Sequence, residues 1–375
     1  MAGKSLESIM GYVPLLGVVR TTVSGIPNPL PKEFMNVTQK CIGDSGVFTQ
    51  ITGERRLATT GQYGGPAKAQ AQRSLARVPI KLIHSYESQP ITPLTMQQLM
   101  SFNKYEQDKG AAVIGYQVRE FAKRSQNLRI AATIMLLGTG VIYRDSSGNV
   151  LPTSSGSDAN LTVSAQIAAA HQGQLLDTTF SGTALIDAKW SLPTTDIPQQ
   201  IVALDERASQ EHGYPLTHIY YGKNVAKYVM NNDFTQDYLV RNPPINTAYV
   251  KNSGIIPQGL FGKTWVPMWL STFRSSDDAT PYSLWDGDLV VFTPDPASGE
   301  ELEDWWGWAE GSFLVPNTVD LVTTQQGLGA FEMKYGMGAY GQMSHNPPGL
   351  INYQFDTFLP YVRNPSVIYQ ADVVF

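Results

Sequence analysis

The chain has 375 residues, of which 42% are hydrophobic, and it can therefore bury a large core in one domain or in two or three lobes. Its single cysteine excludes an intramolecular disulfide and is typical of a protein that folds in a reducing compartment. Its net charge of -5 and pI of about 5.6 argue against a protein that wraps nucleic acid through overall basicity.

The charges are unevenly placed along the chain. Residues 54–129 contain 12 Lys or Arg and 5 Asp or Glu, a net charge of +7, whereas residues 275–333 contain 12 acids and neither Lys nor Arg. Such segments can be solvated faces without a partner, or they can meet each other within one chain or between copies. The longest apolar stretch, residues 130–143, is shorter than the roughly 20 residues that cross a bilayer, so we expect a soluble protein with no membrane partner.

Residues 1–50 are rich in glycine, proline and short apolar pieces and show no sustained helical or strand period. They predict an extended N-terminal arm, ordered mainly by packing on something else. Residues 51–90 predict an extended hairpin loop, because glycines separate its two flanking segments and Val78, Ile80 and Leu82 alternate as in a strand. The cationic residues of this hairpin are Arg55, Arg56, Lys68, Arg73, Arg77 and Lys81.

The strongest helical period lies in residues 111–137. Thr95, with a glutamine three residues later, has the spacing of a capping box and predicts a helix start ahead of this segment. Within it, apolar residues recur at steps of three and four, interrupted only by Ser125. A continuous helix of this length is about 40 Å long. Two glycines predict its end, and a strand is expected at residues 141–143.

A second section of mixed helices and strands follows a Ser/Gly/Thr-rich linker at residues 153–160. Asp196 and Pro198 predict the start of a helix, Asn224 predicts the cap of another, and residues 219–221 between them are predicted as a strand. Further strands are predicted at residues 265–270, 289–293, 331–335, 353–359 and 367–375. Because regular strand–helix–strand alternation is absent, the sequence predicts the α+β class.

One short motif is similar to the nucleophile loop of chymotrypsin-like proteases, namely Gly43-Asp44-Ser45-Gly46. In those enzymes the histidine and aspartate precede the serine, whereas the first histidine here is His84. A tight turn is the better interpretation of the motif.

A second motif, residues 336–341, matches the glycine spacing of a dinucleotide-binding loop and follows a predicted strand. That chemistry requires a helix whose N-terminus receives the pyrophosphate. Asn346-Pro347-Pro348 follows instead and prevents such a helix, so we interpret the motif as a loop between strands.

The remaining candidate ligands lack a supporting pattern. The five histidines have no metal-ligand spacing, and Asp286-Gly287-Asp288 lacks the further oxygens of a calcium loop and predicts a turn. Trp305, Trp306 and Trp308 could stack on a sugar or a base, but beside acidic residues they indicate a core or an interface. The sequence therefore predicts no catalytic residue, no cofactor-binding residue and no metal site.

Three stretches carry a resemblance to a known family. Residues 136–143, followed by a turn at residues 145–148, are similar to the family's transition from spine helix to strand. Trp190 and the segment from Asp196 to Val229 are similar to its axial lobe, and residues 358–365 are similar to its closing strand. From about residue 45 onward the chain resembles tailed-bacteriophage major capsid proteins, and more narrowly the lambda-type major capsid protein E family.

The resemblance implies the tailed-phage (herpesvirus-like) capsid fold, of the α+β class. Its implied parts are an N-terminal arm, an extended β-hairpin loop, a peripheral domain with a long spine helix, an axial αβ domain, a return to the peripheral domain and C-terminal strands. In the same order, these parts occupy approximately residues 1–50, 51–90, 91–184, 185–300, 301–349 and 350–375.

The resemblance also implies a function, that of a head protein without enzymatic activity. Copies would assemble as homo-pentamers and homo-hexamers into an icosahedral shell that encloses double-stranded DNA, contacted only non-specifically. The short N-terminal region implies a separate scaffolding protein; a portal is expected as a partner, and a decoration protein is left open. Assembly would take place in the host cytoplasm, and the final location would be the virion.

The uneven charge suggests one contact between copies. We expect the hairpin cations Arg55, Arg56, Lys68, Arg73, Arg77 and Lys81 to face the acids Glu300, Glu301, Glu303 and Asp304 of a neighbour. Where the family usually has Arg-x-Glu on the spine helix, this chain has Asn127-Leu128-Arg129, so a helix salt bridge of that pattern is not expected.

Three alternatives stay open at this point. The first is the shell of a bacterial nanocompartment, which has the same fold and holds cargo enzymes. The second is another virion part, such as a tail or portal component, which would form tubes or rings. The third is an enzyme that uses Ser45 or the late glycine loop.

Overall fold

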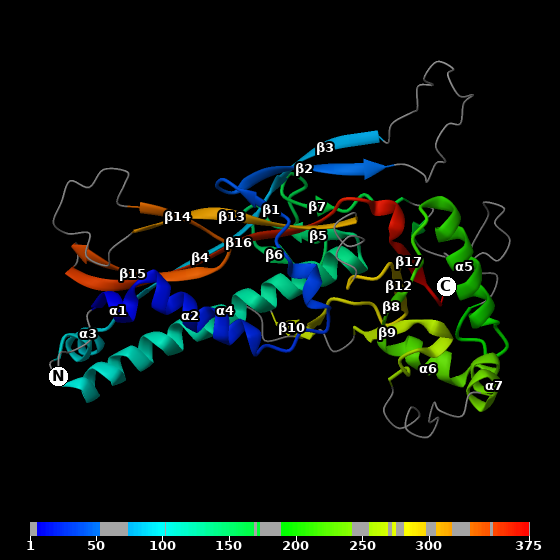
Figure 1. The fold of residues 1–375 in the computed structure, drawn as a ribbon, viewed down its shortest axis with the longest axis horizontal. Helices are drawn as coiled ribbons and strands as arrows, with labels where there is room; N and C mark the ends of the chain where they lie inside the picture. The colour runs from blue at the N-terminus through cyan, green and yellow to red at the C-terminus, as the bar shows by residue number, and fades with distance from the viewer. Residues whose placement is uncertain are drawn as a thin grey trace, which may run out of the picture.

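The structure is a computed structural model that describes residues 6–52, 74–101, 103–168, 171–172, 189–241, 255–268, 272–274, 281–297, 305–316, 331–345 and 348–374. Figure 1 shows an elongated lobe built on one long helix, beside a compact lobe that contains the C-terminus. Within the described ranges, no helix is both long enough and apolar enough to cross a membrane.

The elongated lobe combines helices on one side with strands on the other (Figure 1). Its helices are α1 (Leu6–Met10), α2 (Tyr12–Ser24), α3 (Pro93–Met100) and α4 (Lys104–Gly138). Its main sheet contains β1 (Gln39–Cys41), β4 (Ile83–Pro90), β13 (Trp306–Pro316), β14 (Phe331–Tyr335), β15 (Gly338–His345) and β16 (Pro348–Val362). Strand order is β1-β13-β16-β15, with β14 also on β13 and β4 also on β16.

The compact lobe is a four-stranded sheet with helices packed on it. The sheet has the order β17 (Tyr369–Asp372), β12 (Leu289–Thr293), β8 (His218–Tyr221) and β9 (Thr264–Pro267). The helices are α5 (Ile197–Glu211), α6 (Lys223–Asn231) and α7 (Asp233–Arg241). Together the two lobes confirm the predicted α+β class.

Three smaller sheets complete the described strands. One joins β2 (Ser45–Thr52) to β3 (Ser74–Lys81), and another joins β5 (Val141–Arg144) to β6 (Val150–Leu151) and β7 (Val163–Ser164). The third pairs β10 (Thr272–Arg274) with β11 (Pro281–Ser283). Single 3-10 turns lie at Lys32–Met35, Leu260–Gly262 and Pro365–Val367.

The predicted long helix is confirmed, and it is longer than expected. α4 has 35 residues, about 52 Å at 1.5 Å per residue, and begins behind Asn103, whose side chain accepts a hydrogen bond from the backbone N–H of Tyr105. Gly110 lies within the helix. A Cβ at Gly110 would lie 3.0 Å from Leu99, so the glycine lets α3 pack closely against α4.

The predicted cap at Thr95 is wrong by one turn. α3 begins at Pro93, and Thr92 is its N-cap, since the side chain of Thr92 accepts from the backbone N–H of Thr95. Proline is favoured in the first helical turn because it has no N–H to satisfy there, which places the cap one residue before it.

The prediction that residues 1–50 lack helical structure is also wrong. α2 packs along α4 and β15, with Leu15 and Val19 buried. Met10 packs on the backbone of Gly341, where a Cβ would lie 2.5 Å from its Cε. Pro14 lies in the first helical turn, where it is tolerated, so it does not break the helix. Packing rather than local periodicity therefore orders this segment.

The predicted hairpin is confirmed in its two arms. β2 and β3 pair antiparallel from Ser45 opposite Lys81 to Thr52 opposite Ser74. The connection at residues 53–73 lies outside the described residues. Buried Arg144 fixes the base of the hairpin, because its guanidinium donates to the carbonyls of Lys81 and Leu82, at 2.9 Å each, and to that of Leu161.

In the compact lobe, the predicted helix start at Asp196 is confirmed, because its side chain accepts from the backbone N–H of Gln199. The predicted cap at Asn224 is wrong. Gly222 occupies the N-cap of α6, and a Cβ there would lie 2.1 Å from the carbonyl oxygen of Asp286. The close approach of two backbones therefore selects glycine, and Asn224 donates to Asp288 instead.

Of the two glycine motifs, the first is a turn and the second is a short turn followed by a strand. Gly43 has φ +78 between β1 and β2, and this confirms the predicted tight turn around Ser45. The predicted loop at residues 336–341 is wrong in extent, because only Gly336 and Met337 connect β14 to β15 and the rest lies in β15. β15 is paired with β16 along its length. This pairing gives the backbone N–H and C=O groups hydrogen-bond partners that a loop would not provide.

Candidate interaction surfaces

A buried ionic cluster joins α4 to the main sheet. Nη2 of Arg129 lies 2.5 Å from Oδ1 of Asp356, its Nε lies 2.9 Å from Oδ2, and its Nη1 lies 3.3 Å from Oε1 of Glu310. The hydroxyl of Ser125 donates to Asp356 as well. The guanidinium also lies 5.2 Å from the ring centroid of Phe358. α4, β13 and β16 are thus tied together at one point.

The electrostatics of this cluster follow from burial and proximity. Burial opposes the charge of Arg129, but the two carboxylates outweigh it and raise the pKa of the guanidinium. Burial, together with the neighbouring Asp356, raises the pKa of Glu310, although Arg129 and Lys40 act in the opposite direction. Arg129 therefore forms ion pairs with two carboxylates. Of these, Glu310 is the more exposed and Asp356 is fully buried.

Sequence reasoning missed this cluster, although a signal was present. Ser125 and Arg129 follow Ile114, Val118 and Phe121 at steps of three and four, which places both polar residues on the buried stripe of the helix. Two polar residues on an apolar stripe indicate a buried partner. The helix lacks the Arg-x-Glu pattern, and Arg129 instead forms ion pairs with carboxylates on distant strands.

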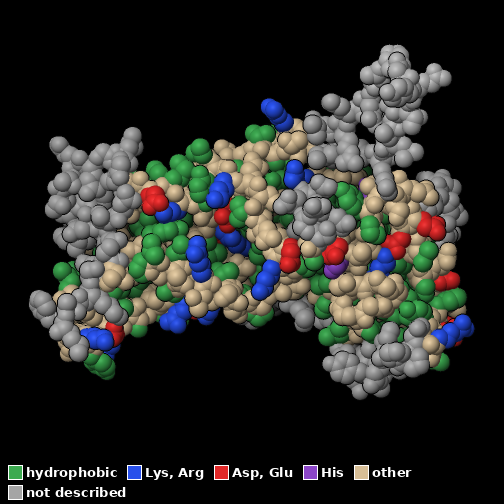
Figure 2. Space-filling model, viewed as in Figure 1, with side chains coloured by type: hydrophobic (Ala, Val, Ile, Leu, Met, Phe, Trp, Pro, Cys, Tyr) green, Lys and Arg blue, Asp and Glu red, His purple; other side chains and the backbone are tan. Residues whose placement is uncertain are grey.

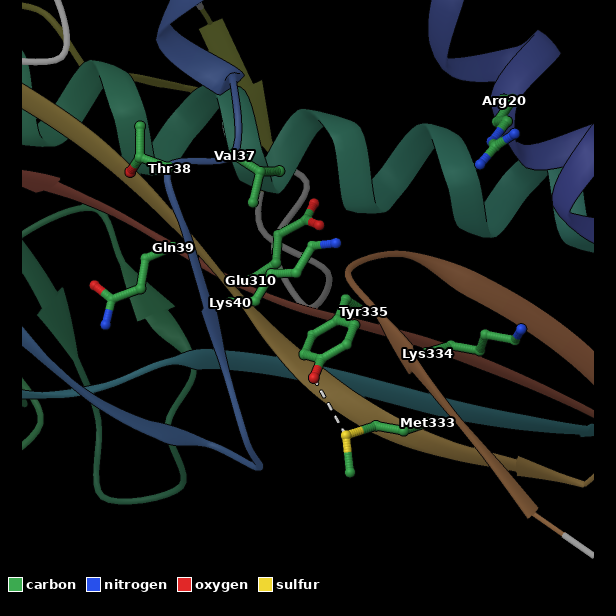
Figure 3. Close-up of a pocket in the computed structure, with 9 residues that line it drawn as sticks. All are labelled: Arg20, Val37, Thr38, Gln39, Lys40, Glu310, Met333, Lys334 and Tyr335. Atoms are coloured by element: carbon green, nitrogen blue, oxygen red, sulfur yellow. Dashed lines mark hydrogen bonds between the residues drawn. The ribbon is translucent and has the colours of Figure 1, made fainter. Parts of the chain in front are cut away.

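An open groove of about 780 Å³ lies beside this cluster. It is lined by Arg20, Val37, Thr38, Gln39, Lys40, Glu310, Met333, Lys334 and Tyr335. Figure 3 shows these side chains, with Lys40 and Glu310 near the centre and Arg20 at one end. Nζ of Lys40 lies 5.3 Å from the ring centroid of Tyr335, whose hydroxyl donates to Sδ of Met333 at 3.3 Å. Cations, an aromatic ring and a thioether suit a polypeptide partner more than a small substrate.

Most residues of the predicted contact between hairpin cations and acids lie outside the described part of the structure. Arg77 and Lys81 are described; both are exposed on β3, opposite Thr49 and Ser45. The remaining predicted residues, Arg55, Arg56, Lys68, Arg73, Glu300, Glu301, Glu303 and Asp304, lie outside the described residues. The pairing stays a prediction.

The tryptophans are core residues, as predicted. Trp305, Trp306 and Trp308 are at most 1% exposed, and Nε1 of Trp306 donates to the carbonyl of Phe34 at 2.9 Å. The ring of Phe34 meets Trp306 edge-on, with ring centroids 4.9 Å apart. Stacking on a sugar or a base would need an exposed face, which none of the three indoles has.

A second polar cluster lies in the compact lobe. Glu211 accepts from Tyr369 at 2.6 Å and from Nε of Arg207 at 2.8 Å, and it lies 3.0 Å from Nε2 of His171. Burial disfavours its charge, but these hydrogen bonds outweigh burial and lower its pKa to about 2. Each group faces a structural partner, so the cluster holds α5 to β17 and to the segment that contains His171.

His212, next in the chain, makes folding sensitive to pH. Burial lowers its pKa from 6.5 to about 4, so the folded chain binds fewer protons than the unfolded chain between these values. Stability should fall as pH falls through this window, by at most about 3 kcal/mol from this group. His212→Asn removes the titration and keeps an acceptor for the backbone N–H of Tyr214. Urea unfolding at pH 7 and pH 4 should show a smaller loss for the variant than for the wild type; equal losses would contradict the assignment.

Metal ligation has no support in the part of the chain that is described. Within it, no three or more His, Cys, Asp or Glu residues group to hold a metal ion. Asp286 and Asp288 form a turn, since Oδ1 of Asp286 accepts from the backbone N–H of Asp288 at 2.9 Å.

No protein-family model matches the chain, and no curated protein matches its sequence. Its fold is similar to that of a candidate capsid protein of a prophage of Escherichia coli CFT073, with a TM-score of 0.53 and 11% identity over 96% of this chain and 98% of the other. Weaker likenesses include a phage-related protein from Bordetella bronchiseptica RB50 (TM-score 0.47, 10% identity, 95% and 96% covered) and the mature capsid of bacteriophage PhiM1 (0.45, 12%, 92% and 87%).

The first of these likenesses spans nearly the whole of both chains. The chain therefore has the α+β tailed-phage capsid fold, which the sequence resemblance implied.

Proposed function

We propose that the chain is a major capsid protein of a tailed bacteriophage, a structural protein whose copies assemble into a closed shell. The observation that carries the proposal is the full-length likeness of its fold to a candidate prophage capsid protein. The elongated lobe, the paired hairpin arms and the groove give each copy several separate surfaces for contact with neighbours (Figure 1).

Assembly by symmetry explains why no single contact has to be strong. Pentamers and hexamers repeat the same contacts around closed axes, so many modest interfaces add up to a stable icosahedral shell. Membership of the lambda-type major capsid protein E family and the six part boundaries given above belong to this proposal. The role is structural, and no step of it requires a catalytic residue or a cofactor.

The proposed partners follow from that role. They are other copies of the chain, a separate scaffolding protein, a portal and packaged double-stranded DNA, and a decoration protein is left open. A net charge of -5 suits a wall that confines DNA without gripping it. Assembly is proposed in the host cytoplasm and the final location in the virion.

Electron microscopy of the expressed chain tests the proposal. The chain is expressed alone and with a candidate scaffolding protein, and the high-mass fraction is imaged. We expect closed polyhedral shells. Rings or tubes would favour a tail or portal component, and a uniform small oligomer under both conditions would refute a shell protein. Mass spectrometry of the contents separates DNA from the cargo enzymes of a nanocompartment.

The proposed contact between hairpin cations and acids gives a charge-reversal prediction. Arg55→Glu with Arg56→Glu should block shell formation, because like charges then face Glu300, Glu301, Glu303 and Asp304 of the neighbour. Reversing two of the acids to Lys in the same chain should restore part of the yield, measured by sedimentation. Normal assembly of the Arg55/Arg56 variant would rule out the contact.

A further inference from the structure

The groove on the elongated lobe runs along an open strand edge. Three consecutive residues of β14 line it, and since successive side chains of a strand point to opposite faces, this indicates that the edge of the strand borders the groove. β14 pairs with β13 on one side, and none of the described strands pairs with its other side. Across from it lies β1, where Lys40 is in register with Glu310. An unpaired edge beside a groove is a place where another polypeptide can bind.

The groove also has an excess of positive charge. Lys334 is paired with Glu332, and Glu310 shares Arg129 with Asp356. Arg20 and Lys40 are exposed, and neither forms an ion pair within the described part of the chain. Arg20 and Lys40 are thus groove cations within ion-pair distance of none of the described carboxylates, although Lys40 is near enough to Glu310 to favour its charge.

The distribution of charge on the face shown in Figure 2 and along the sequence indicates which kind of partner fits the groove. In Figure 2 the Lys and Arg side chains are spread over the elongated lobe, whereas the acidic side chains are more frequent toward the compact lobe. The sequence between the compact lobe and β13 contains four acids within five residues, Glu300, Glu301, Glu303 and Asp304, and no cation. This is the densest run of carboxylates in the chain.

We infer that the groove receives the acidic segment 298–304 of a second copy of this chain, whose carboxylates meet Arg20 and Lys40. In its own chain the segment ends at Trp305, and five residues of extended chain separate Trp305 from Glu310 in the groove, about 16 Å. This covalent attachment holds the segment away from the groove of its own chain. The same segment of a second copy is not held in this way. The inference rests on the proposed self-assembly and is an alternative to the predicted contact of these acids with the hairpin cations, because one segment cannot occupy both places at once.

A peptide-binding experiment tests this separately from shell formation. A fluorescein-labelled peptide with the sequence of residues 295–304 is titrated with the full-length, unassembled chain, and anisotropy is followed at low and high salt. The control peptide has Asn and Gln in place of Asp and Glu. The protein variants are Arg20→Glu/Lys40→Glu, the milder Arg20→Gln/Lys40→Gln, the hairpin variant Arg55→Glu/Arg56→Glu, and the control Lys104→Glu/Lys123→Glu, which reverses two exposed cations elsewhere on the same lobe.

We expect the wild type to bind the acidic peptide, the groove reversal to weaken binding about tenfold or more, and the neutral groove variant to weaken it by a smaller factor. The hairpin variant and the control should stay within about twofold of the wild type, and salt should weaken binding. Circular dichroism and the neutral variant distinguish lost binding from lost folding.

Binding that survives the groove reversal, or that the hairpin reversal abolishes instead, would overturn the inference. Equal binding of the control peptide would overturn it too, because the carboxylates would then be irrelevant. The proposed function is decided independently: shells of the wild type under the electron microscope support it whichever peptide result is obtained.

Discussion

Replacing Asp356 by Asn should lower the free energy of unfolding by about 3–5 kcal/mol, measured by urea denaturation of the unassembled chain. The carboxylate is fully buried and takes two hydrogen bonds from Arg129 and one from Ser125. After this substitution the buried guanidinium of Arg129 keeps only Glu310 as a carboxylate partner. The NH2 group of the new asparagine is also a donor that faces the donors of the guanidinium.

A second ion pair on the same helix provides the control. Arg124 and Glu87 lie 2.6 Å apart but are 56% and 33% exposed, so Arg124→Met should cost less than about 1 kcal/mol. The double variant Arg129→Met/Asp356→Leu should lose less stability than Asp356→Asn, since it removes both charges together. Similar losses for Asp356→Asn and Arg124→Met would show that the buried cluster is not a stabilising anchor of the elongated lobe.

The second large effect is expected at Phe34. This side chain is fully buried, and its ring meets Tyr220 of the compact lobe as well as Trp305 and Trp306 at the start of β13, with ring centroids 4.9 to 6.2 Å apart. Phe34→Ala removes one of the contacts between the two lobes and leaves a cavity, at a cost of about 3–5 kcal/mol.

Phe234→Ala is the matched control, because the same atoms are removed from a ring that is 43% exposed on α7; its cost should stay below about 1 kcal/mol. Phe34→Leu should fall between the two, since it keeps most of the buried volume. If Phe34→Ala unfolds at the same urea concentration as Phe234→Ala, the segment before β1 does not hold the lobes together.

The candidate surfaces could be anticipated only in part. The uneven charge along the sequence pointed to contacts between copies, and the hairpin that carries the cations has the predicted paired arms. The groove could not be predicted, because it brings Arg20, Lys40 and Lys334 together from parts of the chain that are distant in sequence. Their proximity depends on the parallel pairing of β1 with β13 across 270 residues, which no local pattern encodes.

Local physics allowed the sequence by itself to determine most of the secondary structure. The periodicity of α4, the caps of α5, the turn at Gly43 and the apolar strands β8 and β12 depend on residues within a few positions of one another. Together with the residue stretches at 136–143, 196–229 and 358–365, these elements carried the capsid-fold resemblance, and the comparison of structures bears out the fold.

The tertiary structure decided everything that depends on burial against a distant partner. α2 is helical because Leu15 and Val19 find α4, although its own sequence has a proline and a glycine. Arg129 is a buried anchor because carboxylates of β13 and β16 reach it, and Gly222 is a cap because another backbone lies against it. Short-range preferences are weak where such contacts compete, so the side chain's partners, rather than its neighbours in sequence, fix the outcome.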